Sequence, residues 1–234
     1  MQRQMIKGMD ISLNFIEKGG GFPLILLHGN GESCDYFVNQ IAAFSAHFKV
    51  IAIDTRGHGA SPRGKAPFGI DRFAEDLKGF FDEKGIEKAH ILGFSDGGNI
   101  ALKFALKYPE RVEKLILNGA NLTPKGVKTS VQLPIVLAYR LVSIISRFDK
   151  GAVAKKELLG LMVNEPNIKA DELAVLNLPT LVIAGKNDMI KEDHTRLIAK
   201  SLPYSSLKII EGDHFIAAKN SIEFNAEVLK FLLT

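Results

Sequence analysis

Short apolar runs alternate along this chain with amphipathic stretches that have helical spacing. Residues 11–17 alternate apolar and polar side chains, which is typical of a half-buried antiparallel strand near a sheet edge. The later apolar runs are continuous, as expected for strands covered on both faces. The pattern predicts strands at 11–17, 23–27, 49–53, 89–93, 113–117, 179–185 and 207–210. It predicts helices at 36–48, 70–84, 99–107, 134–148, 152–163, 192–201 and 221–233.

This alternation indicates an α/β fold with about seven or eight strands, mostly parallel, and helices on both faces of the sheet. The alternation stops between 122 and 177, where only helical patterns occur. We therefore divide the chain into a core, 1–121 and 178–234, and a short helical cap, 122–177. The helix at 134–148 should begin with Pro134 in its first turn. It is apolar on nearly every side, so it should need cover on more than one face.

A turn of small residues follows the strand at 89–93 and precedes a helix. Gly93, Ser95 and Gly97 fit G-x-S-x-G, in which a serine on a sharp strand-to-helix turn exposes its hydroxyl above a sheet. The flanking glycines avoid collisions that Cβ atoms would make in so tight a turn. Ser95 is therefore the candidate nucleophile, although a glycine-rich turn can also hold a purely structural serine.

A serine nucleophile needs a base, and six histidines compete for this role. His214 follows the last predicted strand and would lie at the same sheet edge as Ser95. Asp188 follows the penultimate strand and is the candidate that orients the imidazole. The resulting chain order of nucleophile, acid and base is Ser95, Asp188, His214. It is the order found where a G-x-S-x-G serine lies on this kind of α/β fold. The alternative reading of Asp188 and His214 is a surface pair.

When a serine attacks a carbonyl group, the carbonyl oxygen becomes negatively charged, and two backbone N–H donors are needed to stabilise this oxyanion. These should be the N–H of Asp96, directly after the nucleophile, and the N–H of Asn30, in the glycine-rich loop after the strand at 23–27. The Asp96 side chain has two readings. It could cap the helix that starts beside it, or it could bind substrate.

Composition narrows the classes of protein. The net charge of +4 and pI near 9.0 are mildly basic, but lysines and arginines are scattered and not interleaved with aromatics, so we expect no nucleic-acid partner. The single cysteine, Cys34, excludes an internal disulfide and suits a reducing compartment. No segment reaches the roughly 18 apolar residues of a membrane span, so we expect a cytoplasmic protein without a membrane partner. Nothing calls for a metal or another cofactor.

The chain resembles the α/β-hydrolase superfamily through five motifs. They are HGNG at 28–31, DTRGHG at 54–59, GFSDGG at 93–98, GKND at 185–188 and GDH at 212–214. The resemblance implies, in turn, an oxyanion loop, a structural loop, the nucleophile elbow, the acid and the base. Within the superfamily, the SDGG of 95–98 and the KYP of 107–109 are similar to the biphenyl-hydrolase-like group that includes valacyclovir hydrolase. That likeness implies that Asp96 binds the ammonium of amino-acid esters. The cap looks shorter than in capped members.

We therefore expect a serine hydrolase that cleaves a small, partly apolar carboxylic ester or related acyl substrate. The same triad also serves carbon–carbon bond hydrolases, amidases, lactonases and perhydrolases. Two further classes stay open: a non-catalytic receptor that uses a hydrolase pocket, and an interaction scaffold that exposes the apolar cap helix. The sequence leaves the substrate, the leaving group and the oligomeric state open.

Overall fold

The strands of this computed structural model form one sheet, and the structure describes residues 3–8 and 10–234. Eight strands lie in the order β1-β2-β4-β3-β5-β6-β7-β8. Their bounds are β1 Arg3–Gly8, β2 Ile11–Lys18, β3 Pro23–Leu27, β4 Lys49–Ile53, β5 Ala89–Phe94, β6 Val112–Asn118, β7 Thr180–Gly185 and β8 Ser205–Ile210. Strands β3 to β8 run parallel, and β2 pairs antiparallel with both β1 and β4.

The sequence analysis did not predict β1. This edge strand pairs along its whole length with β2, in a register that joins Arg3 to Ile16 and Gly8 to Ile11. Strand β2 follows β1 directly in the chain, so the two form a hairpin. The residues of β1 show no clear alternation of apolar and polar side chains, so the sequence pattern did not indicate a strand there.

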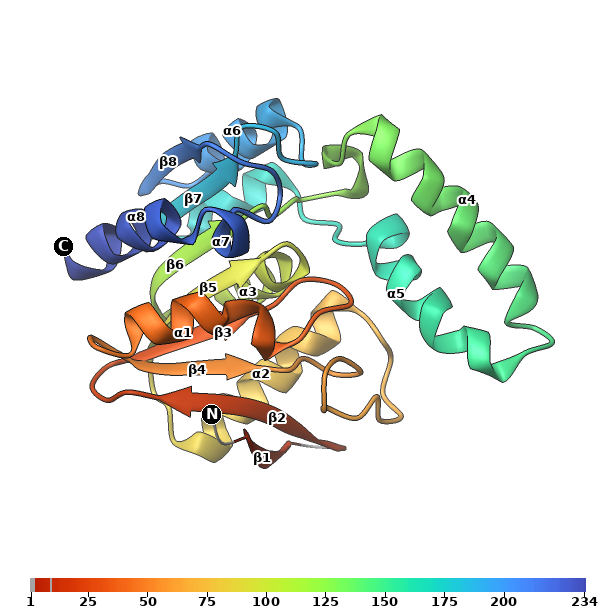
Figure 1. Cartoon of the computed structure of the whole chain (residues 1–234), viewed down its shortest axis with the longest axis horizontal. Coiled ribbons are helices and arrows are strands. Elements are labelled where there is room, and N and C mark those ends of the chain that lie inside the picture. The colour runs from red at the N-terminus through yellow and green to blue at the C-terminus, as the bar shows by residue number, and fades with distance from the viewer. Residues whose placement is uncertain (1–2, 9) are drawn as a thin grey trace.

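Helices cover both faces of the sheet (Figure 1). Their bounds are α1 Val38–Phe44, α2 Ile70–Lys84, α3 Asp96–Lys107, α4 Thr129–Ile145, α5 Val153–Asn164, α6 Glu192–Ser201, α7 Ile216–Lys219 and α8 Ser221–Leu233. Five short 3₁₀ turns add η1 Cys34–Phe37, η2 Pro109–Arg111, η3 Pro124–Gly126, η4 Lys150–Ala152 and η5 Ala170–Val175. Helices α2, α3 and α6 pack in one apolar cluster, and α1, α7 and α8 pack in the other.

The central strands show why their apolar runs are continuous. Ile25 and Leu27 of β3 belong to the first cluster, whereas Leu24 and Leu26 belong to the second. Successive side chains of a strand point to opposite faces, so a strand with helices on both sides must be apolar at every position. The α/β fold with a mostly parallel sheet is confirmed.

Helices α4 and α5 form a hairpin in the insertion between β6 and β7, and this hairpin stands beside the core at the right of Figure 1. The predicted start of α4 was wrong. The helix begins at Thr129, so Pro134 lies inside it. Proline removes one N–H, whose helical acceptor would have been the carbonyl of Ser130. This loss occurs near the exposed helix start, where solvent can reach the carbonyl.

Candidate active site

Ser95 lies on the turn between β5 and α3 in a conformation that side chains rarely adopt. Its φ is 52° and its ψ is −119°, and it is the one non-glycine residue with positive φ in the described part of the chain. The neighbouring glycines allow this geometry. A Cβ on Gly93 would collide with the backbone of Gly97, and a Cβ on Gly97 would collide with the carbonyl of Leu27. The turn therefore holds Ser95 strained at the carboxyl edge of the sheet.

The structure brings Ser95, His214 and Asp188 together. His214 Nε2 lies 3.0 Å from Ser95 Oγ, and His214 Nδ1 lies 2.7 Å from Asp188 Oδ1. The three residues come from the loops after β5, β8 and β7, which end at one edge of the sheet. His214 and Asp188 are buried, at 5% and 3% exposure, so solvent does not compete with these contacts.

The chain of contacts assigns a role to each nitrogen of His214. A carboxylate only accepts hydrogen bonds, so Nδ1 carries the hydrogen that Asp188 Oδ1 accepts. Nε2 is then free to accept the proton of the Ser95 hydroxyl. The backbone N–H of Ile190 also donates to Asp188 Oδ1, at 2.8 Å, which fixes the carboxylate in place.

Asn30 and Asp96, whose backbone N–H groups are the predicted oxyanion donors, line one pocket with Ser95. In the described part of the chain, neither the N–H of Asn30 nor that of Asp96 donates to a protein acceptor. Asp96 opens α3, so its N–H is one of the free donors of the first helical turn. These two groups are available to a ligand oxygen, and nothing within the protein has to be broken to use them.

The side chain of Asn30 links Asp96 to the helical insertion. Asn30 Nδ2 donates to Asp96 Oδ2 at 2.9 Å and to the carbonyl of Leu158 in α5 at 2.9 Å. Asn99 Nδ2 donates to Asp96 Oδ1 at 3.2 Å. The carboxylate is thus held by two side-chain amides, and these, rather than backbone N–H groups of α3, are its hydrogen-bond partners. Burial raises the pKa of Asp96 to about 6, against the opposing effect of the Asn30 amide.

A pocket beside Ser95 contains a second carboxylate, which the sequence analysis did not anticipate. Its walls include Ser95, Asp96 and, from the insertion, Met162 and Glu165. Burial raises the pKa of Glu165, and its negative charge contributes to the raised pKa of Asp96. Glu165 Oε2 accepts the N–H of Ile70 at 2.6 Å, so the carboxylate is anchored at the start of α2. Its position directly after α5 was visible in the sequence, but the pattern gave no sign that it faces Ser95.

Two other histidines, buried His28 and half-buried His194, hold loops in place. His28 Nδ1 lies 2.7 Å from the carbonyl of Gly29, and its Nε2 accepts the N–H of Thr55 at 3.0 Å. Burial lowers the pKa of His28 to about 4, so this ring is neutral near pH 7. His194 Nε2 accepts the N–H of Leu122 at 2.9 Å, which ties α6 to the start of the insertion.

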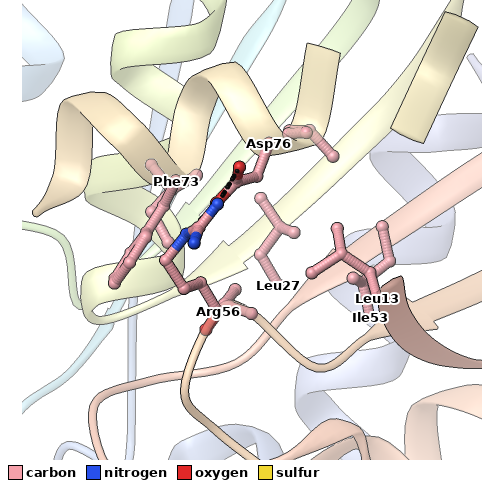
Figure 2. Close-up of a pocket in the computed structure, with 9 residues that line it drawn as sticks. Leu13, Leu27, Ile53, Arg56, Phe73 and Asp76 are labelled. Atoms are coloured by element: carbon pink, nitrogen blue, oxygen red, sulfur yellow. Dashed lines mark hydrogen bonds and ion pairs between the residues drawn. The ribbon is translucent and has the colours of Figure 1, made fainter. Parts of the chain in front are cut away.

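A small cavity lies apart from this site, and none of its lining residues belongs to the group of Ser95, Asp188 and His214. Figure 2 shows the Arg56 guanidinium directed at Asp76, with Phe73 beside it. The cavity volume is about 10 Å³, room for about one water molecule. Its walls are otherwise mostly apolar, so it is a packing gap around a buried ion pair.

No group of three or more histidine, cysteine, aspartate or glutamate side chains in the described residues could hold a metal ion. In the same residues, no helix combines the length and the apolar character needed to cross a bilayer.

The comparisons with known proteins agree with this fold. A family model described as "alpha/beta hydrolase fold" matches residues 23–140. Because that match covers half of the chain, the chain belongs to the α/β-hydrolase fold family and is a hydrolase of this fold.

Three similar proteins illustrate the range within the family. A putative carbamate hydrolase RutD from Azorhizobium caulinodans is 28% identical, with 96% of each chain covered. A 2-hydroxy-6-oxononadienedioate/2-hydroxy-6-oxononatrienedioate hydrolase from Paraburkholderia phymatum is 32% identical over 83% of this chain and 66% of that one. The solved enol-lactonase from Burkholderia xenovorans LB400 superposes with a TM-score of 0.84, at 20% identity, over 99% of this chain and 100% of that chain.

Proposed function

We propose that this protein is a serine hydrolase that cleaves a small, partly apolar carboxylic ester or related acyl substrate through an acyl-enzyme. The observation that supports this most directly is the chain of contacts from Asp188 through His214 to Ser95. No cofactor takes part in the proposed reaction.

In the proposed reaction, Ser95 Oγ attacks the substrate carbonyl while His214 Nε2 takes the hydroxyl proton. The tetrahedral intermediate collapses, the bond to the leaving group breaks, and His214 returns the proton to the leaving group. Water then attacks the acyl-enzyme by the same route and frees Ser95. Asp188 holds the imidazole in the required tautomer and stabilises the imidazolium.

The backbone N–H groups of Asn30 and Asp96 form the proposed oxyanion hole. One such donor is worth on the order of 3 kcal/mol of transition-state stabilisation in enzymes where it has been removed. The positive end of α3 points at the same place and favours the developing negative charge.

The Asp96 carboxylate, together with Glu165, is the proposed binding site for an amine on the substrate. Two carboxylates line one pocket with Ser95, and the residues that line this pocket include no lysine, arginine or histidine. An ammonium group on the substrate would restore charge balance there. The proposal includes the division into a hydrolase core, 1–121 and 178–234, and a cap, 122–177, since Glu165 reaches the pocket from the cap.

A second candidate is carbon–carbon bond hydrolysis, because the relative from Paraburkholderia phymatum is named for that kind of dioate substrate. A dioate carries two carboxylates, which the charges of Asp96 and Glu165 would repel. Carbamates and lactones, named for the other two similar proteins, carry no such charge and fit the proposed chemistry of acyl transfer.

A fluorophosphonate probe tests the nucleophile. We expect one adduct, located at Ser95 by peptide mass spectrometry, and none in Ser95→Ala. Ser206→Ala, at an exposed position in β8, is the matched control and should label like the wild type. An unlabelled folded protein would refute the mechanism.

A panel of p-nitrophenyl esters of increasing acyl length, with lactones and carbamates beside it, identifies the bond that is cleaved. We expect turnover to be fastest for the shortest acyl chains. A ligand that raises the melting temperature equally in the wild type and in Ser95→Ala, without turnover of any panel member, would indicate a receptor instead.

A further inference from the structure

The outer face of α4 is apolar and exposed. Leu133, Leu137, Leu141 and Ile144 are each more than half exposed, and Phe148, just after the helix, is 89% exposed. Their spacing of three or four residues places them along one side of the helix. The expectation that α4 is covered on more than one face was therefore wrong, because α5 covers only the opposite side.

The position of α4 explains this exposure. The helix packs on α5, which itself contacts the core through the carbonyl of Leu158 and through the ion pair of Glu157 with Arg63. In Figure 1, α4 is the outermost element of the hairpin, and the turn between α4 and α5 lies far from the sheet. The exposed face thus points away from the rest of the described chain.

Basic residues border this apolar face. Arg140 lies in α4, three residues from both Leu137 and Ser143 and next to the apolar stripe, and Arg147 lies in the turn just after the helix, beside Phe148; both are exposed. Lys150 and Lys155 follow in the turn and in α5. In the described part of the chain these four cations form no ion pair.

The hairpin, residues 129–164, contains five basic side chains and two acidic ones, Asp149 and Glu157. The Asp149 carboxylate accepts the N–H of Gly151 at 2.7 Å, and Glu157 pairs with Arg63 at 2.6 Å. The hairpin therefore presents an apolar stripe with a cationic border, and it offers little negative charge to balance that border.

We propose that the outer face of α4, with Phe148 and the adjacent basic residues, docks on an anionic lipid surface. Apolar side chains entering the acyl boundary, with arginines and lysines at the headgroup level, are the contacts that interfacial helices make. A second copy of this chain would match the apolar stripe but would bring two cationic borders together. An anionic lipid surface satisfies both features.

The helix would lie in the plane of the membrane. At 17 residues, α4 is about 25 Å long, short of the roughly 30 Å hydrocarbon core, and its other face packs on α5. The expectation of no membrane partner rested on the absence of a spanning segment, which does not bear on surface docking. This proposal does not depend on the proposed reaction.

Co-sedimentation with vesicles tests the docking. We expect the protein to pellet with vesicles of equal parts phosphatidylcholine and phosphatidylglycerol, and to stay in the supernatant with pure phosphatidylcholine. Binding should weaken as salt is raised, because salt screens the attraction between basic side chains and anionic headgroups. Equal binding to both vesicles, or binding to neither, would overturn the proposal.

Two variants locate the binding face. Leu137→Glu/Leu141→Glu should reduce binding to the anionic vesicles by at least about tenfold, because it places charges in the acyl boundary. Arg140→Glu/Arg147→Glu should reduce it by a similar factor. The control is Ile222→Glu in α8, whose side chain is 88% exposed on the core, and it should bind like the wild type.

The same variants test whether a second copy of this chain, and not a lipid surface, covers the outer face of α4. Circular dichroism checks that each variant is folded, which we expect because every substituted side chain is exposed. Sedimentation velocity at several protein concentrations should show that the wild type and Leu137→Glu/Leu141→Glu have the same oligomeric state. A dimer that this variant dissociates, or vesicle binding that both double variants retain, would contradict lipid docking by α4.

Discussion

Two polar clusters of this protein, around Arg56 and around Ser95, differ in how completely their hydrogen-bond donors are satisfied. Around Arg56, all five guanidinium N–H donors have acceptors: the carboxylates of Asp76 and Asp10 and the carbonyl of Arg63. Around Ser95, the Asn30 and Asp96 N–H groups have no protein acceptor in the described chain, and the backbone of Ser95 is strained. The first cluster is complete by itself, whereas the second leaves groups available to a ligand.

This difference suggests that the Arg56 cluster contributes to stability and that the Ser95 cluster serves the proposed reaction. Arg56 is fully buried and braces the loop after β4 against α2 through Asp76. The guanidinium lowers the pKa of Asp10, so this charge pairing is also retained at acidic pH. In the Ser95 cluster, free donors and a strained backbone cost stability, and both are available to the proposed reaction. Substitutions in the two clusters should therefore change different measured quantities.

The largest expected effect is on catalysis. Asp188→Asn should lower kcat by about 10⁴-fold, because an amide at this position favours the wrong tautomer of His214. The melting temperature should change little, since the side chain keeps its shape. Ester turnover and thermal unfolding of the same preparation measure both quantities. A loss of less than about tenfold would exclude Asp188 as the orienting acid.

The second effect is on stability. Arg56→Met should reduce the free energy of unfolding by about 3 kcal/mol, because the buried Asp76 carboxylate loses two of its hydrogen bonds and keeps only its ion pair with Arg72 among the described residues. Urea denaturation measures this loss, and kcat of the folded variant should stay near the wild-type value.

The double variant Arg56→Met/Asp76→Leu is the matched control for this loss. It removes both charges together and should recover much of the stability. If it is as unstable as Arg56→Met alone, the lost stability comes from packing and not from the hydrogen bonds that the Asp76 carboxylate loses.

The sequence predicts the Ser95 cluster well because its signals are local. The turn at Ser95 needs glycines on both sides, and the loops that hold Asp188 and His214 each follow a short apolar strand. In a parallel sheet, loops that follow strands all lie at the carboxyl edge, whatever their own sequence. The contacts of Ser95, His214 and Asp188 thus follow from strand order alone.

Features that depend on distant contacts were missed or misplaced. Glu165 reaches the pocket through its contact with the start of α2, which is distant in the sequence, and no local pattern encodes this. The same is true of the open face of α4: its composition predicted burial, but the number of helices available to cover it is a tertiary property. Helix α7 is too short, at four residues, to have a periodic signal of its own.

The third prediction concerns the proposed amine site and its pH dependence. Burial raises the pKa of Asp96 to about 6, so Asp96 is protonated below that pH and ionised above it. The ratio of kcat/KM for an amino-acid ester to that for a matched neutral ester should therefore rise between about pH 5 and pH 7. Asp96→Asn should lower this ratio at pH 7 by about tenfold and remove its rise.

Glu165→Gln distinguishes a direct role of Asp96 from a general effect of charge. Removing the negative charge of Glu165 should shift the midpoint of the pH profile downward, because that charge raises the pKa of Asp96. A neutral ester measured in parallel controls for changes at Ser95. A ratio that is independent of pH in the wild type would contradict amine binding by Asp96.

The smallest expected effect is at the contact between the loop after β4 and the helical insertion. Arg63 and Glu157 form an ion pair at 2.6 Å, but their side chains are 35% and 22% exposed. Glu157→Gln should therefore lower the free energy of unfolding by less than about 1 kcal/mol, far less than Arg56→Met. Hydrogen exchange should be faster in α5 than in the wild type at low salt, and the difference should shrink as salt screens the pair. An effect on stability as large as that of Arg56→Met would mean that the exposed contact is as important to the fold as the buried cluster.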